Sequence, residues 1–423
     1  MSSLRNKIYL LLRKSEKFFK TDMLYLAKGG FWMTAGTAIS WPISLVMSVA
    51  FANLLSKDSY GTYQYVLGIV SIFGIMNLSG INTSITRSVA RGAEGSLFDA
   101  LRTKIRFGML GGLGSGILGA YYFFQGNTLL GSAFLICSVF IPFWDNFGIY
   151  VSYLYGKKRF DLMNMYEVLA QFVSSLSLII TLFLTHDVLV LIFVYFVVFT
   201  VVRGSLFSYM VKKYPPNSTK DPNVISYGKH LSLMVAVSNI SSNLDKVLLF
   251  HFLGPISVAE YTFAQAVPMK VNGFLRIVSR LAFPKMATAN KDALEKTLMR
   301  KILLLVIPSA AVAFLFIAAA PYIFAIFFPK YMEAVIWSQI VALTLLLQPF
   351  ALITTFLSAQ EQKKSLYIYN FGMPIIRAVT FFTLIPTLHL FGAILSLVAI
   401  KTADTIFQLV LFYRKRSSIM TPV

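Results

Sequence analysis

Apolar residues fill long runs of the chain, and short segments rich in charged or turn-forming residues separate these runs. A helix needs about 20 residues to cross the hydrocarbon core of a bilayer, and most of the runs reach that length. The pattern therefore predicts an all-α integral membrane protein with twelve transmembrane helices. The predicted spans are 29–53, 61–86, 107–125, 129–155, 161–184, 187–211, 229–253, 259–283, 301–326, 333–358, 366–387 and 390–413.

Positively charged residues are distributed unequally between the two sides of these spans. The connecting segments on one side hold 30 of the 38 Lys and Arg residues, whereas those on the other side hold only Lys57 and Lys330. Positive charge collects on the cytoplasmic side of membrane proteins. The distribution therefore predicts that both termini are cytoplasmic. It also predicts short exterior connections, at 56–60, 126–128, 185–186, 254–258, 327–332 and 388–389.

The composition agrees with a membrane location and excludes several classes of function. Hydrophobic residues make up 57% of the chain and charged residues 13%, whereas soluble domains have about 25% charged residues. The net charge of +21 is spread over short patches between apolar runs, unlike the single basic face of a nucleic-acid-binding protein. One cysteine, Cys137, and four scattered histidines provide no metal or redox motif. We therefore expect no cofactor, no metal and no enzymatic activity.

Two parts of the chain resemble each other at a separation of about half its length. Segment 55–65 resembles segment 253–263, and Pro142-Phe143 corresponds to Pro349-Phe350. Each half would then hold six spans in the same orientation, which predicts a pseudo-twofold axis along the membrane normal. The predicted organisation is a basic amphipathic segment 1–28, a six-helix bundle 29–211, a cytoplasmic linker 212–228, a second six-helix bundle 229–413 and a basic tail 414–423.

Ionisable residues inside the predicted spans are the candidate functional groups, because charge within a bilayer is costly and normally faces a cavity. Lys270 lies 11 residues into its span, which is ~16 Å from the exterior edge at ~1.5 Å per residue and near the middle of the bilayer. The spans of the C-terminal half hold five cations and two anions, a surplus of positive charge that predicts an anionic cargo. The candidate substrate-binding cations are Lys246, Lys270, Arg276, Arg377 and Lys401, and the candidate ion-coupling acids are Asp145, Asp245 and Asp404.

Several of these residues have a second interpretation. Lys401 and Asp404 are three residues apart on one helix, so they either neutralise each other or face the cavity. Asp245 either pairs with a nearby lysine or carries a coupling ion, and Asp145 either packs between helices or carries one. We expect Arg203, near the cytoplasmic boundary, to extend its charged end to the membrane surface.

Two short motifs carry a family resemblance. The first is the segment 54–64, and the second is Asn243-Leu244-Asp245-Lys246 followed by Ala259-Glu260-Tyr261. With these motifs the chain resembles the polysaccharide transporter (PST) family, whose best-known members are the O-antigen (Wzx-type) flippases. That family belongs to the multidrug/oligosaccharidyl-lipid/polysaccharide (MOP) exporter superfamily. The resemblance covers essentially the whole chain and implies a MATE-like fold of two six-helix bundles.

The resemblance implies a flippase that moves undecaprenyl-pyrophosphate-linked oligosaccharide repeat units from the cytoplasmic to the outer leaflet of the bacterial inner membrane. Alternating access would drive this step of O-antigen, capsule or exopolysaccharide synthesis. The implied partners are the polyprenyl-pyrophosphate-linked oligosaccharide, membrane lipids, H⁺ or Na⁺, and other membrane proteins of polysaccharide assembly. Among the site residues, a motif match carries over only Asp245 and Lys246.

Three alternative functions stay open at this stage. A cation-coupled multidrug exporter of the same superfamily would favour buried acids, whereas this chain has more buried cations. A lipid II flippase would fit a cationic cavity but usually has two further spans. A membrane-embedded polysaccharide polymerase would usually present a sizeable exterior loop, and the predicted exterior connections are only a few residues long.

Overall fold

The computed structural model describes residues 23–288, 291–360 and 362–417, and over these residues the chain is helical with no strand. The predicted amphipathic segment 1–28 and the basic tail 414–423 lie mostly outside the described residues. The first part of the chain forms α2 (Met23–Leu54), α3 (Lys57–Phe73), η1 (Gly74–Asn77), α4 (Gly80–Ala90), α5 (Ser96–Phe124), α6 (Thr128–Phe140), η2 (Asn146–Ile149), α7 (Tyr150–Gly156), α8 (Phe160–Leu184) and α9 (Val188–Lys213). The second part forms α10 (Val224–Ser241), α11 (Leu244–Leu253), α12 (Pro255–Thr288), α13 (Lys291–Phe327), η3 (Pro329–Tyr331), α14 (Ala334–Ala342), η4 (Leu343–Phe350), α15 (Ala351–Ala359) and α16 (Lys363–Ser417).

The helical membrane fold that the sequence predicts is confirmed. Among the described residues, eight helical segments are long and apolar enough to cross a membrane, or nine if α3 and α4, bent by 45° at their junction, form one span. The number of twelve spans stays a prediction. Helix α12, which carries Lys270 in its interior, is not among the eight.

The long helix α16 is a hairpin of two antiparallel arms. His389 has φ 56° and ψ −136°, which breaks the helix at the predicted exterior connection 388–389. The hydroxyl of Ser396 donates to the carbonyl oxygen of Thr380 at 3.5 Å, and the hydroxyl of Tyr369 donates to Asp404 at 2.6 Å. Contacts between residues so far apart in one helix require the arms to fold back on each other.

The side on which each connection lies can be measured directly. We expect reporters fused after Asp58, Gly254 and His389 to read as exterior, and reporters after Lys158 and Lys220 to read as cytoplasmic, because positive charge is retained in the cytoplasm. Paired alkaline phosphatase and green fluorescent protein fusions would test each position. A cytoplasmic reading at any of the three exterior positions would contradict the twelve-span topology.

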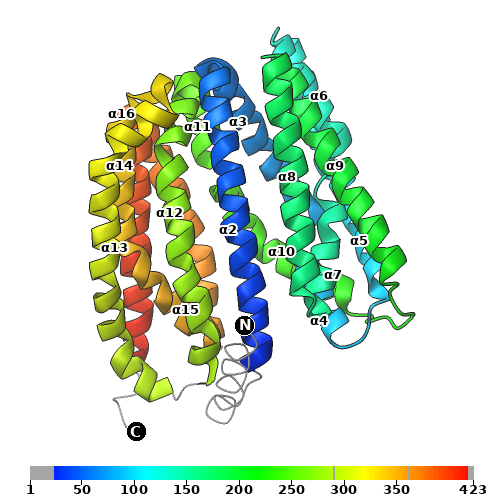
Figure 1. The fold of residues 1–423 in the computed structure, drawn as a ribbon, viewed down its shortest axis with the longest axis vertical. Helices are drawn as coiled ribbons and strands as arrows, with labels where there is room; N and C mark the ends of the chain where they lie inside the picture. Colours follow the sequence, from blue (N-terminus) through cyan, green and yellow to red (C-terminus); the bar gives the residue numbers. More distant parts are fainter. Residues whose placement is uncertain (1–22, 289–290, 361, 418–423) are drawn as a thin grey trace, which may run out of the picture.

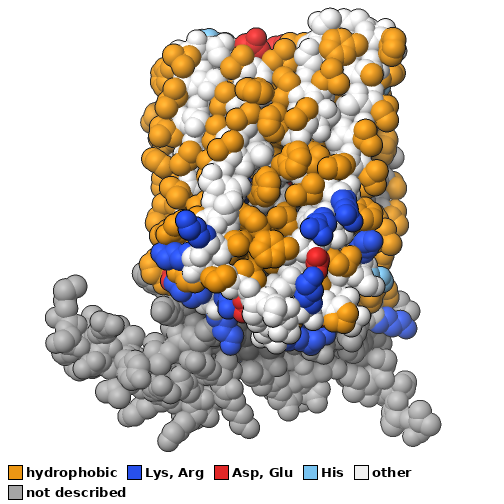
Figure 2. Space-filling view, turned by 90° about the vertical axis from the view of Figure 1, so that its right-hand side faces the viewer, with side chains coloured by type: hydrophobic (Ala, Val, Ile, Leu, Met, Phe, Trp, Pro, Cys, Tyr) orange, Lys and Arg blue, Asp and Glu red, His pale blue; other side chains and the backbone are white. Residues whose placement is uncertain are grey.

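The helices form two groups on either side of a central set. Helices α4 to α9 lie on one side in Figure 1 and α12 to α16 on the other, with α2, α3, α10 and α11 between them. We count α2 and α3 with the first group and α10 and α11 with the second, in the order of the chain. The start of α2 and the end of α16 lie at the same end of the molecule. Lys and Arg side chains gather toward this end in Figure 2, beneath a broad apolar surface. Helix α5 has exposed apolar side chains such as Leu113 and Ile117.

Among the described residues, the largest apolar cluster spans both groups at one end of the molecule. One large cluster of buried residues joins α2, α3 and α9 to α11, α12 and α14. At the basic end, separate clusters occupy the first group, around Tyr150, and the second, around Phe356. We call the end that carries connections 54–57, 254 and 327–333 the predicted exterior end. The two groups therefore share a core toward the predicted exterior end, whereas at the basic end the described clusters are separate and α10 packs on the first of them through Val224.

Three helix breaks lie near the centre of the molecule. The first lies at η1, where Leu78 adopts the left-handed φ of 51° before α4 begins. The second is the turn region 141–145, which contains Pro142. The third separates α10 from α11 at Asn243. Asn77 donates to the carbonyl oxygen of Ile141 at 3.2 Å, so the first two breaks lie against each other. Breaks inside membrane helices leave backbone polar groups that must be satisfied within the protein, and such breaks often form binding sites.

Candidate functional site

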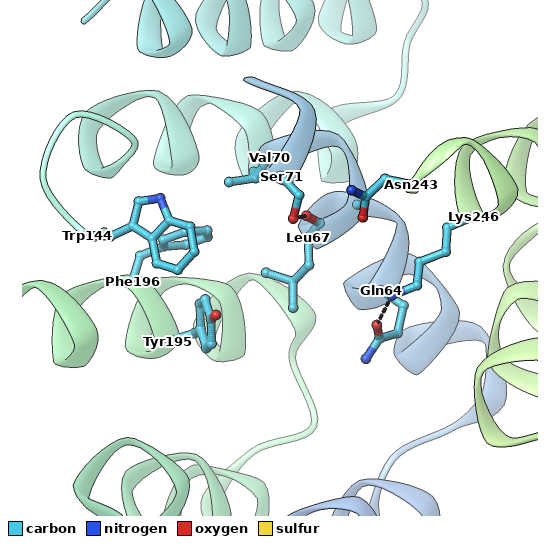
Figure 3. Close-up of a pocket in the computed structure, with 10 residues that line it drawn as sticks. Gln64, Leu67, Val70, Ser71, Trp144, Tyr195, Phe196, Asn243 and Lys246 are labelled. Atoms are coloured by element: carbon cyan, nitrogen blue, oxygen red, sulfur yellow. Dashed lines mark hydrogen bonds between the residues drawn. The ribbon is translucent and has the colours of Figure 1, made fainter. Parts of the chain in front are cut away.

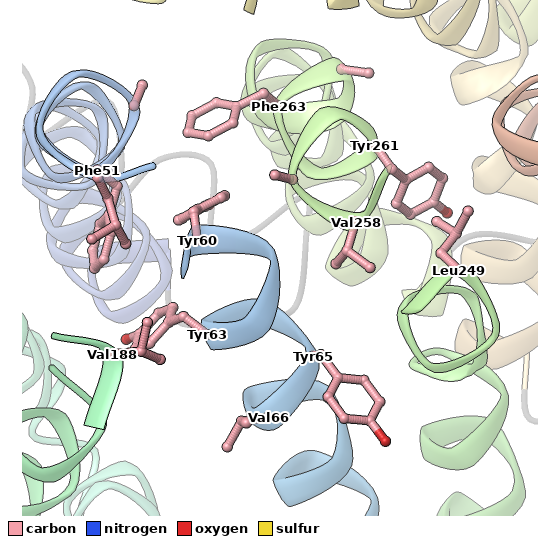
Figure 4. Close-up of a cluster of buried hydrophobic side chains, with 14 of the residues drawn as sticks. Phe51, Tyr60, Tyr63, Tyr65, Val66, Val188, Leu249, Val258, Tyr261 and Phe263 are labelled. Carbon is pink, nitrogen blue, oxygen red and sulfur yellow. The ribbon is translucent and has the colours of Figure 1, made fainter. Parts of the chain in front are cut away.

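Aromatic side chains close the predicted exterior end between the two groups. The ring of Tyr60 in α3 lies 4.7 Å from that of Phe263 in α12, and Tyr65 stacks on Phe250 of α11 at 3.8 Å. Figure 4 shows α3 lying among side chains of α2, α11 and α12. Buried aromatic pairs contribute roughly 0.5–1.5 kcal/mol each beyond the area that they bury. This packing seals one end of the space between the two groups.

Gly61 allows the closest approach of the backbones at this end. A Cβ atom added to Gly61 would lie 1.7 Å from the carbonyl oxygen of Pro255 in α12, a distance that no side chain can accept.

We expect Gly61→Ala to force the exterior ends apart and to reduce transport at least tenfold. Gly74→Ala is the matched control, because a Cβ atom there meets nothing within 4 Å. Transport measured at equal membrane levels would compare the two variants. Full activity of Gly61→Ala would contradict tight closure of this end.

An ion-pair cluster joins the same two groups, and we call it the exterior latch. Lys57, at the start of α3, donates to Glu260 of α12 at 3.0 Å and to Glu333, just before α14, at 2.8 Å. Burial alone would lower the pKa of Lys57, but the hydrogen bonds and charges of Glu333 and Glu260 outweigh it and raise that pKa above its ordinary value. Lys57 therefore stays protonated at neutral pH and holds both carboxylates.

Lys246 and Asp245 lie at the start of α11 and point to different partners. The ammonium of Lys246 donates to the Oε1 atom of Gln64 in α3 at 2.9 Å. Asp245 is 9% exposed and accepts from the hydroxyl of Tyr261 at 2.7 Å and from the backbone N–H of Lys246 at 2.8 Å. Among the described residues, Asp245 therefore forms no salt bridge with a lysine, which was one of its two predicted roles. Its carboxylate accepts a hydrogen bond from the hydroxyl of Tyr261 instead.

Lys270 and Arg377 connect helices through neutral partners. The ammonium of Lys270 in α12 donates to the hydroxyl of Ser44 in α2 at 2.5 Å, and the Nη1 atom of Arg377 in α16 donates to the hydroxyl of Ser242 at 2.6 Å. Within the described part of the chain, neither cation forms a salt bridge. Lys246, Lys270 and Arg377 are thus three cations without a salt-bridge partner among the described residues, and the acid Asp245 directly precedes Lys246 in the sequence.

Lys401 and Asp404 form a salt bridge of 3.0 Å within α16. Asp404 also accepts from Tyr369 at 2.6 Å and from Gln408 at 2.7 Å. Lys401 and Asp404 therefore neutralise each other, which is one of the two interpretations that their spacing allowed. Arg276, another predicted substrate-binding cation, lies in α12, but its side chain is outside the described part of the structure.

Asp145 belongs to a polar cluster inside the first group. Arg203 of α9 donates to Asp145 at 2.9 Å, and its other terminal nitrogen lies 3.9 Å from Glu167 of α8. Arg203 is only 15% exposed, so its predicted extension to the membrane surface is wrong: its guanidinium lies against the carboxylates of Asp145 and Glu167 instead. A further buried cation, Lys104, is not among the predicted site residues. Its side chain is completely buried, and its ammonium donates to the Oδ1 atom of Asn82 at 2.7 Å.

A small pocket lies beside Lys246 at the junction of the two groups. It has a volume of about 190 Å³ and is lined by α3, α9, α11 and the turn that precedes η2. Figure 3 shows Trp144, Phe196 and Tyr195 on one side and Gln64, Asn243 and Lys246 on the other. Both groups of helices and one cation thus contribute to this pocket.

The Tyr261 contact changes what a substitution of Asp245 should do. Tyr261→Phe removes a hydrogen bond to a buried carboxylate and should lower stability by roughly 1.5–3 kcal/mol. At equal membrane levels we expect it to reduce transport less than fivefold if Asp245 is only structural. Asp245→Asn should reduce transport more than a hundredfold if the carboxylate binds a coupling ion. Proton- or sodium-driven transport by purified variants would separate the two roles. Equal, mild losses in both variants would contradict ion coupling at Asp245.

Solved structures with the same fold are membrane transporters. An inward-facing MATE-family multidrug resistance transporter of the MOP superfamily aligns with a TM-score of 0.62 and 15% identity, over 94% of this chain and 95% of that chain. The lipid II flippase MurJ in an inward closed conformation aligns with a TM-score of 0.66 and 15% identity, over 89% of this chain and 86% of that chain. A MOP superfamily transporter from Pyrococcus furiosus aligns with a TM-score of 0.57 and 13% identity, over 93% of this chain and 97% of that chain. The chain therefore has the MOP transporter fold that the resemblance implied.

The comparison at the level of sequence is more specific about the family. No curated protein matches the chain. Residues 26–290, however, match the sequence model described as polysaccharide biosynthesis protein. Because this match covers more than half of the 423 residues, the chain belongs to the polysaccharide biosynthesis protein family.

Proposed function

We propose that this protein is a flippase for polyprenyl-pyrophosphate-linked oligosaccharides in the bacterial inner membrane. It would carry the pyrophosphate and sugars from the cytoplasmic to the outer leaflet, for the synthesis of a surface polysaccharide such as O-antigen, capsule or exopolysaccharide. Family membership supports a role in polysaccharide synthesis, and the fold supports transport across a membrane.

The observation that carries the proposal is a surplus of positive charge at the junction of the two groups: three cations without a salt bridge among the described residues, against the single acid Asp245. Lys246, Lys270 and Arg377 are bonded only to neutral side chains among the described residues. Burying positive charge without a counter-charge is costly, so an anionic ligand would repay that cost when it binds. A pyrophosphate offers several oxygens that accept from Arg and Lys.

The same charges disfavour a multidrug exporter. Cationic drugs would be repelled by three positive side chains, whereas a pyrophosphate would be attracted to them. Separation of the two groups at the basic end, and then at the predicted exterior end, would expose the site to each leaflet in turn. Asp145 and Asp245 are the candidate acids for coupling this movement to H⁺ or Na⁺.

A reconstituted system tests the function directly. We expect proteoliposomes with the full-length protein to move a fluorescent undecaprenyl-pyrophosphate-linked disaccharide between leaflets, and protein-free liposomes to leave it in place. Accessibility of the fluorophore to membrane-impermeant dithionite measures the movement. Transport of ethidium without movement of the lipid-linked sugar would instead support the multidrug alternative.

A further inference from the structure

We propose that the pocket beside Lys246 is a subsite for one sugar ring of the cargo. This inference rests on the proposed flippase function and adds the chemistry by which the sugar, rather than the lipid pyrophosphate, is recognised. The pocket would hold one hexose or N-acetylhexosamine ring between α3, α9 and α11.

The size of the pocket fits part of a larger ligand. Pockets that enclose a whole drug-sized molecule usually measure roughly 300–1,000 Å³. The volume here is about 190 Å³, which is too small for an oligosaccharide but sufficient for a single ring. The remainder of the cargo would extend outside the pocket into the space between the two groups.

Aromatic side chains provide a surface for the apolar face of a sugar. The rings of Trp144 and Tyr195 lie 6.1 Å apart with an angle of 46° between their planes, and both line the pocket. The C–H bonds on one face of a pyranose form an apolar surface that packs against such rings, while its hydroxyls point to the edges. Trp and Tyr combine a large apolar area with a polar group, and are therefore suited to this contact.

One donor in the pocket has no partner. The Nε1 atom of Trp144 is buried and bonds to nothing among the described residues. Buried polar groups nearly always have a hydrogen-bond partner. This N–H does not face the open space of the pocket, so a bound ring would have to turn the indole toward itself to provide that partner. A sugar hydroxyl or an N-acetyl carbonyl would accept from it.

The opposite wall offers complementary groups. Ser71 donates its hydroxyl proton to the carbonyl oxygen of Leu67, and Asn243 donates its amide to the carbonyl oxygen of Asn239. The Oγ atom of Ser71 and the Oδ1 atom of Asn243 therefore remain as acceptors for sugar hydroxyls. Lys246 has three N–H donors and uses one on Gln64. Hydroxyls, which both donate and accept, match this mixture better than a purely anionic or apolar ligand would.

The position of the pocket links sugar binding to the transport cycle. Trp144 lies in the break before η2, and Asn243 lies in the break between α10 and α11. Gln64 belongs to the first part of the chain and Lys246 to α11, so the pocket is complete only when α11 lies against α3. A bound ring would therefore favour the arrangement seen here, which is closed at the predicted exterior end.

Binding of matched ligands tests the subsite. The full-length protein in lipid nanodiscs would be titrated with undecaprenyl pyrophosphate, and with the same lipid carrying N-acetylglucosamine or galactose. We expect at least one glycosylated lipid to bind about tenfold more tightly than the bare lipid. Trp144→Leu should abolish this advantage, and Trp144→Phe, which keeps a ring but removes the N–H, should lose about two- to tenfold of it. Neither variant should change binding of the bare lipid.

Controls separate the possible failures. Trp337→Phe, which alters a tryptophan paired with Phe391 away from the pocket, should keep the full advantage. If Trp144→Leu does not fold, Trp144→Phe and Asn243→Leu provide the same test. Equal binding of bare and glycosylated lipids by the wild type, or an undiminished advantage in the Trp144 variants, would overturn the subsite and leave the flippase proposal standing. Failure of the wild type to bind any of the three lipids would overturn both.

Discussion

Neutralising Lys270 or Arg377 should abolish surface polysaccharide while the protein remains in the membrane. Each cation bonds only to a serine hydroxyl among the described residues, so its replacement by Gln removes no salt bridge. An Arg–phosphate interaction, in contrast, is charge-assisted and bidentate, and roughly 1.5–3 kcal/mol is lost with each hydrogen bond to a charged group. We expect at least a hundredfold loss of transport from Lys270→Gln or Arg377→Gln. Polysaccharide on a flippase-deficient strain, normalised to membrane protein level, provides the measurement.

Matched variants make this result interpretable. Arg377→Lys should restore part of the transport, because it keeps the charge but loses the planar pair of donors. Lys212→Gln, an exposed cation at the end of α9, should export normally. Normal export by Arg377→Gln would show that this guanidinium is structural and would remove it from the proposed binding site.

The helical fold could be predicted because its cause is local in the sequence. Apolar runs of sufficient length form membrane helices wherever they occur, and this rule does not depend on tertiary contacts. The predicted exterior connection 388–389 coincides with the break at His389 for the same reason. Pro142 and Pro349, paired by the internal repeat, both lie in irregular segments, at the end of α6 and within η4. Pro42 and Pro308 instead lie inside continuous helices, since neighbouring groups can satisfy the freed carbonyl.

The partners of the candidate site residues could not be predicted, because they are distant in sequence. Lys57 meets Glu260 and Glu333 across 203 and 276 residues, and no periodicity encodes such contacts. Counting residues along a span gives depth but not direction, so the contact of Asp245 with Tyr261 could not be predicted, and both lysine pairing and ion coupling stayed open. The burial of Lys104 could not be predicted, because the predicted span begins at 107. In the structure α5 begins 11 residues earlier, at Ser96, and carries this lysine into the interior.

Reversing the charge of Lys57 should open the predicted exterior end. Lys57 and Glu260 are 25% and 14% exposed, so their attraction is only partly screened, whereas Glu333 is 72% exposed and contributes less. Lys57→Glu would replace two attractive contacts with a cluster of three carboxylates. We expect the equilibrium to shift toward the open exterior by ~1.4 kcal/mol or more, which is about tenfold. The aromatic packing around Tyr60 and Phe263 would then become accessible from outside.

Cysteine labelling measures this shift. Ala259 in α12 is fully buried at the closed end, and the native Cys137 is removed as Cys137→Ser to leave one thiol. We expect a membrane-impermeant maleimide to label Ala259→Cys about ten times faster in the Lys57→Glu background than in the parent. The swap Lys57→Glu with Glu260→Lys should restore slow labelling. The two charges exchange places in this variant, so α3 and α12 attract each other again. Asp58→Asn, an exposed neighbour of Lys57, should leave the rate unchanged. Fast labelling that persists in the swap would mean that the side chain of Lys57, and not its charge, holds the two groups together.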